Sequence, residues 1–217
     1  KLFVMGGDGH CGPLSSVECL DLETGLWSEV APMSTPRLCA GAAVLGGQIY
    51  VVGGLDGDYQ RLSSVESFDP ATGIWTAVPP MNTARYGHDV VSAQSKLFAV
   101  GGNDPGEDEH QNVECFDPST GVWTNINPMN EARYGLGVAV VGDKLFAIGG
   151  SDTQFNNLSS VECLDLSVPN SAWTPVAPMT MPRNDFGVAV TGGKIYAIGD
   201  EYDGDAKDSM ECFDPNE

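Results

Sequence analysis

The stretch KLFAVGG at residues 96–102, an apolar run that ends in two glycines, decides the fold because it recurs along the chain. Its relatives are KLFVMGG (1–7), QIYVVGG (48–54), KLFAIGG (144–150) and KIYAIGD (194–200). The first glycine of each run stands at position 6, 53, 101, 149 or 199, so the steps are 47, 48, 48 and 50 residues. A nearly constant period of this length indicates a repeat architecture that covers almost the whole chain.

One repeat, residues 85–126, contains four short extended segments. RYGHDVVSAQS includes a strand that ends at a polar turn, and KLFAVGG is an apolar strand with both faces covered. After a loop rich in glycine, proline and acids, NVECFDPSTGVW gives a third strand and a D-P turn. VWTNINPM gives the fourth strand, which ends at proline. We name these predicted strands a, b, c and d in chain order.

Four short antiparallel strands per repeat predict the blade of an all-β propeller. Strand a is rich in small residues, as in GLGVAVV (135–141), which suits the crowded axis of a propeller. Tryptophan follows the same period at positions 27, 75, 123 and 173, on strand d, where diverging blades leave volume to fill. No stretch shows a sustained helical period with caps.

Composition limits the classes of partner. The chain has 217 residues, 41% hydrophobic and 18% charged, with a net charge of -20. Such a surface repels nucleic acid phosphates and anionic lipid, so we expect neither nucleic acid nor membrane as a partner. No apolar run approaches the roughly 18 residues that a membrane helix needs.

Cysteine usage predicts a reducing compartment. Four of the six cysteines (19, 115, 163 and 212) occupy one repeat position, and equivalent positions in different blades are too far apart for a disulfide. We therefore expect reduced, buried cysteines and a cytoplasmic location. The sequon at Asn157 argues weakly for the opposite.

A glutamate recurs on strand c and an arginine recurs just before strand a. The glutamates are at 18, 66, 114, 162 and 211, and the arginines are at 37, 85, 133 and 183. Alternation places each glutamate on a face between blades, where a carboxylate needs a partner. We expect each arginine to pair with a glutamate for structural reasons, since catalysis does not require the same pair in every blade.

The sequence carries no recognised catalytic or metal motif. His10 and His110 fall in b–c loops and His88 lies near a strand a, so we expect solvated histidines and no metal site. The acidic stretch DEYDGDAKD (200–208) lacks the spacing of a calcium loop. Nucleophile-elbow, zinc-protease and phosphate-loop patterns are absent. We therefore predict no cofactor and no enzymatic activity, with a propeller oxidase, isomerase or hydrolase as the alternative.

The order of these motifs resembles the Kelch repeat. A double glycine after an apolar strand, an aromatic residue before D-P, tryptophan, and then P-M and arginine recur over residues 1–217. Leu20 and Leu164 replace the aromatic residue, and Gly199-Asp200 replaces the fifth glycine pair. The motifs SSVECxD and APM are most similar to those of the Kelch-like adaptors of cullin-based ubiquitin ligases, although no BTB or BACK region is present.

The resemblance sets an expectation about blade number. The chain reads as one propeller region, 1–217, with three complete blades at 37–78, 85–126 and 133–176, and two partial blades at about 1–30 and 183–214. Both partial blades carry b and c, so they cannot merge, and Kelch propellers typically have six or seven blades. We expect part of a larger propeller, whose open edges meet its remainder or another chain. An open five-bladed ring is the alternative.

The resemblance also implies a binding face. In the family, the b–c loops and the residue after the strand-a arginine line one face around the central channel. We expect these positions to bind a protein or peptide partner. They are Leu38, Tyr86, Tyr134, Asn184, Asp8, His10, Asp56, Tyr59, Asn103, Asp104, Asp152, Phe155 and Tyr202. Acids outnumber Arg61 and Lys207 in these loops, which predicts a partner with basic residues.

Overall fold

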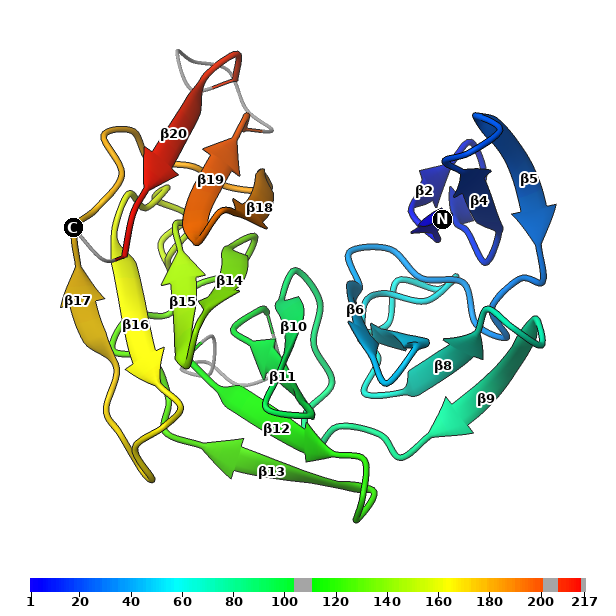
Figure 1. Cartoon of the computed structure of the whole chain (residues 1–217), viewed down its shortest axis with the longest axis horizontal. Coiled ribbons are helices and arrows are strands. Elements are labelled where there is room, and N and C mark those ends of the chain that lie inside the picture. The colour runs from blue at the N-terminus through cyan, green and yellow to red at the C-terminus, as the bar shows by residue number, and fades with distance from the viewer. Residues whose placement is uncertain (104–110, 201–206, 216–217) are drawn as a thin grey trace.

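The computed structural model describes residues 1–103, 111–200 and 207–215. Three positions discussed above, Asp104, His110 and Tyr202, lie outside these residues. The described chain is an all-β propeller of five blades in an open ring, with β1 in the first blade and β20 in the last (Figure 1). Three blades have four antiparallel strands and two have three, which confirms the predicted fold class.

The strand bounds follow the repeat. They are, in blade 1, β1 (Leu2–Met5), β4 (Val17–Asp21) and β5 (Leu26–Val30); in blade 2, β6 (Gly41–Leu45), β7 (Gln48–Val52), β8 (Val65–Asp69) and β9 (Ile74–Val78); in blade 3, β10 (Asp89–Ala93), β11 (Lys96–Val100), β12 (Val113–Asp117) and β13 (Val122–Ile126); in blade 4, β14 (Gly137–Val141), β15 (Lys144–Ile148), β16 (Val161–Asp165) and β17 (Thr174–Val176); in blade 5, β18 (Gly187–Thr191), β19 (Lys194–Ile198) and β20 (Met210–Phe213).

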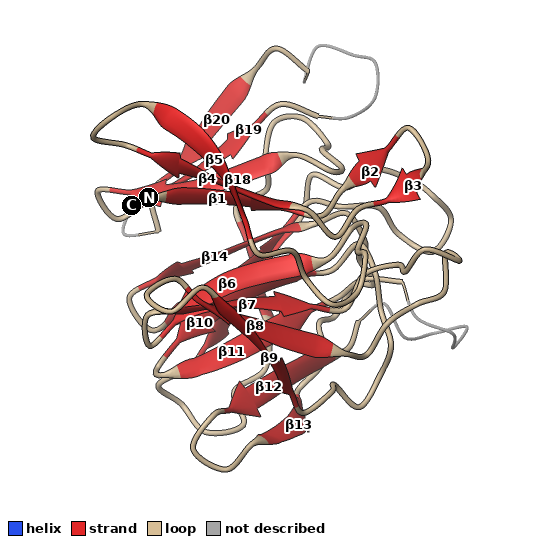
Figure 2. Cartoon of the chain, turned by 90° about the vertical axis from the view of Figure 1, so that its right-hand side faces the viewer, coloured by secondary structure: helices blue, strands red, loops and turns tan. Residues whose placement is uncertain are grey.

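One further hairpin was not predicted from the sequence. β2 (Asp8–Gly9) pairs with β3 (Gly12–Pro13) inside the b–c loop of blade 1. Figure 2 shows this hairpin projecting from the loop-rich side of the molecule.

The innermost strands face the axis, as their small side chains predict. β6, β10, β14 and β18 contact one another in that order around the centre of the ring. Within blade 3 the strand order is β10-β11-β12-β13, and all pairs are antiparallel. The strands that lie second in each complete blade, such as β11, are buried on both faces because a blade covers each side.

The arginine-glutamate pairs expected from the sequence are present. In blade 3, Arg85 Nη2 lies 2.8 Å from Glu114 Oε1, and both side chains are 0% exposed. Arg85 Nη1 also donates to the carbonyls of Gly101 (2.7 Å) and Asn112 (3.0 Å), so the guanidinium joins strands b and c. Equivalent pairs join the arginines at 37, 133 and 183 to the glutamates at 66, 162 and 211.

Each glutamate also binds the turn that enters its blade. Glu66 accepts hydrogen bonds from the backbone and hydroxyl of Ser34, at 2.8 and 2.6 Å. Burial alone raises the pKa of Glu66, but the hydrogen bonds from Ser34 and Arg37 outweigh it and hold the pKa below its usual value. Glu18, which has no such turn before it in these 217 residues, is exposed.

A ring of backbone hydrogen bonds surrounds the axis. Gly87 N donates to Cys39 O (3.0 Å), Gly135 N to Gly87 O (2.7 Å), and Asp185 N to Gly135 O (2.8 Å). All four residues have positive φ, between 49° and 62°. Glycine adopts this conformation without strain, whereas Cys39 and Asp185 adopt it at a cost. One residue in each of blades 2 to 5 thus links the innermost strands in series.

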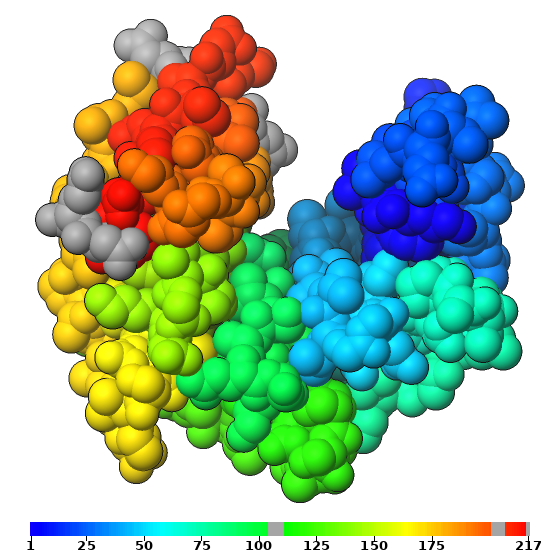
Figure 3. Space-filling view, viewed as in Figure 1, coloured from blue at the N-terminus to red at the C-terminus, as the bar shows by residue number. Residues whose placement is uncertain are grey.

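The ring is open between blades 1 and 5, as the space-filling view shows (Figure 3). Among the described strands, β1 pairs only with β4 and β20 only with β19. Side chains at these edges are exposed, including Leu2 and Val4 (both 51%) and Met210 (61%). Blades 2 to 4, which have neighbours on both sides, hold the largest buried clusters.

Candidate peptide-binding face

The b–c loops and the residues after the arginines lie on one face, because backbone bridges join them. Leu38 pairs with Leu55, Tyr86 with Asn103, and Tyr134 with Ser151. In blade 5 the contact differs, since Asn184 N donates to Asp200 Oδ2 at 3.3 Å. The structure therefore brings the predicted positions of four blades to the same side of the propeller.

Two of the loops share one shape and present an aromatic side chain to solvent. Residues 55–62 and 151–158 both begin with a bridge residue followed by aspartate. Tyr59 and Phe155, at the same place in each loop, have φ of 57° and 63° and are 56% and 76% exposed. Positive φ is uncommon for aromatic residues, and such strain clusters at functional positions.

The aspartates of these loops hold the turn together. Asp56 Oδ1 accepts the backbone N–H groups of Asp58 and Gln60, both at 2.9 Å. Asp152 Oδ1 accepts those of Gln154 (2.8 Å) and Asn156 (2.9 Å). Hydrogen bonds from Asn156 and Gln154 lower the pKa of Asp152, so its carboxylate stays charged. Asp56 and Asp152 therefore fix the shape of the two loops that display the aromatic rings.

Blade 4 forms a pocket of about 610 Å³ with three predicted residues in its lining, Tyr134, Phe155 and Asn184. The rings of Tyr134 and Phe155 meet edge to face, with their centroids 6.1 Å apart. Asn184 is 3% exposed, and its Oδ1 has no hydrogen-bond partner among the described residues. The pocket thus combines two aromatic rings with polar side chains, a combination typical of sites that bind a peptide.

Arg61 connects blades 2 and 3 on this face, which the sequence did not predict. Its Nη2 donates to Asn103 Oδ1 at 2.8 Å, and its Cζ lies 5.6 Å from the centre of the Tyr86 ring. Arg61 is exposed, so this cation-π contact is weak but orders the two side chains. Among the described residues of this face, Arg61 is therefore an ordered cation beside the acids.

The remaining predicted residues lie toward blade 1. Asp8 starts β2, and His10 is exposed at the tip of the hairpin. Tyr59 reaches toward this hairpin, since its hydroxyl lies 3.6 Å from the place of a Cβ on Gly12. Leu38 is half-buried in its bridge. The structure thus spreads these residues across the junction of blades 1 and 2, away from the Tyr134 pocket.

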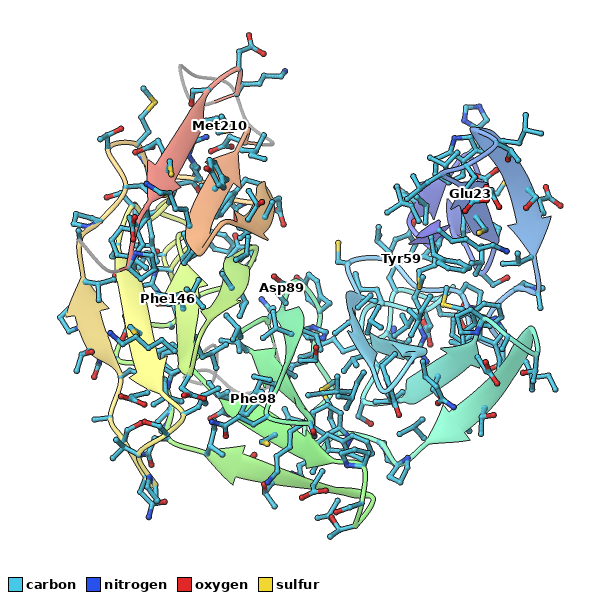
Figure 4. The ribbon with its side chains drawn as sticks, viewed as in Figure 1. Glu23, Tyr59, Asp89, Phe98, Phe146 and Met210 are labelled. Atoms are coloured by element: carbon cyan, nitrogen blue, oxygen red, sulfur yellow. The ribbon has the colours of Figure 1, made fainter. Side chains whose placement is uncertain are left out.

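A second opening of about 420 Å³ lies at the axis, and its lining includes Cys39, His88, Asp89 and Asp185. Figure 4 labels Asp89 on β10, the innermost strand of blade 3. The sequence signal for these two side chains lies in a comparison of repeat positions rather than in a motif. The position of His88 is apolar in the other blades (Ala40, Leu136, Phe186), and that of Asp89 is glycine (41, 137, 187).

The prediction of a solvated His88 is wrong. The side chain is buried, 5% exposed, between blades 2 and 3, where an added Cβ on Gly53 would approach Cε1 to 2.7 Å. Burial, with the charge of Arg85, lowers the pKa of His88 to about 3. Asp89 beside it accepts the Val138 N–H at 2.8 Å, and burial raises its pKa to about 6.

His88→Leu is expected to make the fold less sensitive to acid. In the unfolded chain His88 is protonated below its ordinary pKa of 6.5, whereas in the folded state the imidazole stays neutral down to about pH 3. The wild type therefore loses stability as the pH falls through this window, by about 2 kcal/mol between pH 7 and 5. Asp89 acts in the opposite direction, because its raised pKa favours the protonated fold below about pH 6.

Denaturant titrations at pH 7 and pH 5 measure this effect as the difference between wild type and His88→Leu. That difference should grow in favour of the variant at the lower pH. The exposed His10, replaced by leucine, is the matched control and should leave the pH dependence unchanged. Equal pH dependence of the wild type and His88→Leu would contradict the buried neutral imidazole.

The described residues also bear on two other classes of site. They contain no group of three or more histidine, cysteine, aspartate or glutamate side chains arranged to hold a metal ion. In the same part of the chain, no helix is long and apolar enough to cross a membrane.

Sequence profiles identify the repeat. The profile of the KLHDC2/KLHL20/DRC7 Kelch-repeats domain matches residues 41–217, and that of the Kelch motif matches residues 1–34. The chain therefore belongs to the Kelch-repeat family, as its motifs predicted. A solved structure, described as "Structure of YjhT", aligns with a TM-score of 0.75 at 19% identity, over 90% of this chain and 71% of that one. This likeness shows the fold alone.

Curated relatives match over a short stretch. The human influenza virus NS1A-binding protein is 50% identical over 54 residues, which is 25% of this chain and 8% of that protein. Human Kelch-like protein 23 is 41% identical over 54 residues, 25% of this chain and 9% of that protein. The chain thus matches less than a tenth of the length of these relatives. The similarity is confined to this stretch of 54 residues.

Proposed function

We propose that the protein is a non-enzymatic interaction module that binds an extended polypeptide on its loop face. The observation that carries this proposal is the pocket of Tyr134, Phe155 and Asn184. An exposed ring on a strained backbone costs free energy in the absence of a partner. A peptide that covers the two rings recovers part of that cost.

The charge of the chain favours a basic partner. The net charge is -20, and Asp152 and Asp200 lie beside the residues of the pocket. A lysine or arginine in the bound segment gains long-range attraction from this field. The name of the influenza virus NS1A-binding protein, which shares the repeat, states a protein partner and supports the same class of function.

Two finer proposals follow from the family. Similarity to Kelch-like proteins supports a role in substrate recognition for a cullin-based ubiquitin ligase. Six free cysteines, three of them buried, support a reducing, cytoplasmic location. Co-purification of the full-length protein with a cullin tests the ligase role, and recovery of the full-length protein without a cullin would contradict it.

Tyr134→Ala and Phe155→Ala are each expected to speed dissociation of a bound peptide about tenfold or more, because buried aromatic anchors set residence time. Ligands selected from a peptide array should be rich in lysine or arginine. Their association should slow between low and physiological salt, where the screening length falls to about 8 Å. Surface plasmon resonance measures both rates.

Ile74→Ala is the matched control for these variants. Ile74 is 59% exposed on β9, the outermost strand of blade 2, and should leave both rates unchanged. Selection of acidic peptides, or binding that ignores salt and both aromatic residues, would place recognition elsewhere on the molecule.

A further inference from the structure

The b–c loops of blades 2 and 4 are built alike but differ at one position beside the next blade. Residues 55–62 and 151–158 have the same length. The bridge that closes each loop ends at Arg61 in blade 2 and at Asn157 in blade 4. A long cationic side chain in blade 2 is therefore replaced by a short neutral one at the same place in blade 4.

In blade 2, the side chain of Arg61 reaches across the junction to blade 3. Its Cζ lies over the Tyr86 ring, 5.6 Å from the ring centre, and its Nη2 donates to Asn103 Oδ1 at 2.8 Å. Tyr86 is the residue after the buried arginine of blade 3, and Asn103 follows the double glycine of that blade. This junction thus holds a guanidinium between an aromatic ring and an amide oxygen.

In blade 4, the shorter Asn157 bonds within its own blade. Ser151 Oγ donates to Asn157 Oδ1 at 2.7 Å. The pocket of about 610 Å³ lies at this junction, because its lining combines the loop of blade 4 with Pro182 and Asn184 at the entry to blade 5. The side chain that spans the junction in blade 2 therefore has no counterpart in the loop of blade 4.

The repeat relates the lining of this pocket to the surroundings of Arg61. Lining residues with a counterpart at the junction of blades 2 and 3 include Phe155, Asn156, Asn157, Pro182 and Asn184. The counterparts, in the same order, are Tyr59, Gln60, Arg61, Ala84 and Tyr86. Figure 4 labels Tyr59, the counterpart of Phe155. The pocket is thus the space of the Arg61 contact without its arginine.

The pocket also offers the chemical groups that hold Arg61. Aromatic surface comes from Tyr134 and from Phe155, whose side chain is 76% exposed. Asn156 donates from Nδ2 to Asp152 Oδ2 at 2.9 Å, so the Oδ1 end of its carboxamide is turned away from that aspartate. Asp152 and Asp200, which accepts the Asn184 N–H at 3.3 Å, add negative charge beside the pocket. These groups favour a flat cation with several donors.

We propose that the pocket binds the guanidinium of an arginine side chain on the partner polypeptide, in the place that Arg61 takes at the junction of blades 2 and 3. The inference rests on the proposed function and narrows its ligand from a basic segment to arginine. A guanidinium stacks on a ring and donates in its own plane, whereas an ammonium is a compact and strongly hydrated point charge. Arginine is therefore preferred to lysine at this site.

The capped tripeptide acetyl-Gly-Arg-Gly-amide is the probe, because it carries one guanidinium and no other charge. We expect saturable changes in the nitrogen–proton correlation spectrum at the backbone of Phe155 and at the side-chain amides of Asn156 and Asn157. The same tripeptide with lysine, or with the neutral isostere citrulline, should bind about fivefold more weakly or worse. Equal affinity for arginine and lysine would overturn the proposal, as would no binding of the probe.

Exchanging the two loop residues tests the repeat argument in both directions. Asn157→Arg gives blade 4 its own guanidinium and should weaken probe binding about tenfold or more, because the site is then occupied most of the time. Arg61→Asn vacates the junction of blades 2 and 3 and should create a second site, seen as shifts at Tyr86 and Asn103. An unchanged affinity of Asn157→Arg, or no second site in Arg61→Asn, would overturn the proposal.

Gln154→Arg is the matched control for the added charge. Gln154 is exposed in the same loop but does not line the pocket, and the substitution keeps its backbone N–H bond to Asp152. The affinity for the probe should change less than about twofold, since exposed charges are screened. A loss equal to that of Asn157→Arg would assign the effect to charge alone and overturn occupation of the pocket.

The outcomes separate this inference from the proposed function. If peptides selected from the array bind but tolerate lysine in place of arginine, the preference for arginine is wrong and the interaction module stands. If the probe binds and follows both exchanges while no array peptide binds, the proposed function is wrong and the guanidinium site stands.

Discussion

Arg85→Ala is expected to lower the free energy of unfolding by about 3 to 5 kcal/mol, because it leaves Glu114 charged and buried without its ion partner. Both side chains are 0% exposed, so water does not replace the guanidinium. The variant also removes donors from the carbonyls of Gly101 and Asn112. Urea denaturation followed by circular dichroism measures the loss.

The same pair in blade 5 is the matched control. Glu211, the partner of Arg183, is 21% exposed at the open edge, so water compensates part of the lost contact there. Arg183→Ala should therefore cost less than Arg85→Ala. Arg85→Lys should recover only part of the stability, since lysine lacks the planar fork that reaches two strands. Equal losses at the two sites would show that burial does not set the strength of this pair.

Trp123→Ala should destabilise the protein by about 3 to 5 kcal/mol, the usual cost of removing a large aromatic side chain from a packed interior. The ring is 5% exposed, lies 5.1 Å from the Phe116 ring, and donates to Pro79 O of the preceding blade. Its loss opens a cavity between two blades and removes one of their polar links. Thermal and urea unfolding measure the effect.

Trp27→Ala provides the comparison within the same repeat position. Trp27 is 49% exposed because no blade covers it, so its removal should cost about 1 kcal/mol or less. Trp75 is half-buried and should fall between the two. A loss that is the same for all three variants would mean that packing between blades contributes little to stability.

The repeat made much of the fold predictable from the sequence. Each position of the repeat occurs in several blades. The small residues of strand a, the glutamate of strand c and the arginine before strand a therefore each recur often enough to be recognised as structural. The pairing of Arg133 with Glu162, for example, follows from burial and alternation, without knowledge of the blade angle. Physical constraints that act in every blade leave a periodic signal.

Features that occur once were harder to predict. The β2–β3 hairpin pairs Asp8 with Pro13 and Gly9 with Gly12, whereas the loops of blades 2 and 4 form a single bridge at the same place, Leu55 with Arg61 and Ser151 with Asn157. The contact of Arg61 with Asn103 depends on how far one side chain reaches across a blade junction. His88 did leave a signal, because its column is otherwise apolar, and a comparison of columns rather than of motifs would have predicted its burial.

The candidate binding face was predictable in place but not in detail. The sequence indicated which loops share a side, whereas the left-handed backbone of Tyr59 and Phe155 follows from turn geometry. The carboxylates of Asp56 and Asp152 read as free acids in the sequence, yet each accepts two backbone N–H groups. The pocket at Tyr134 arises because blade 5 supplies Asn184 beside it.

The backbone ring from Cys39 to Asp185 has a consequence for the evolution of propellers. At the three junctions between blades 2 and 5, one blade donates an N–H and its neighbour accepts through a carbonyl, always in the same direction around the axis, so these junctions are head-to-tail and alike. The geometry of such a hydrogen bond does not depend on the number of blades. Duplication or loss of one blade keeps the ring chemistry intact, and the side-chain volume wedged between blades selects the number at which a circle closes.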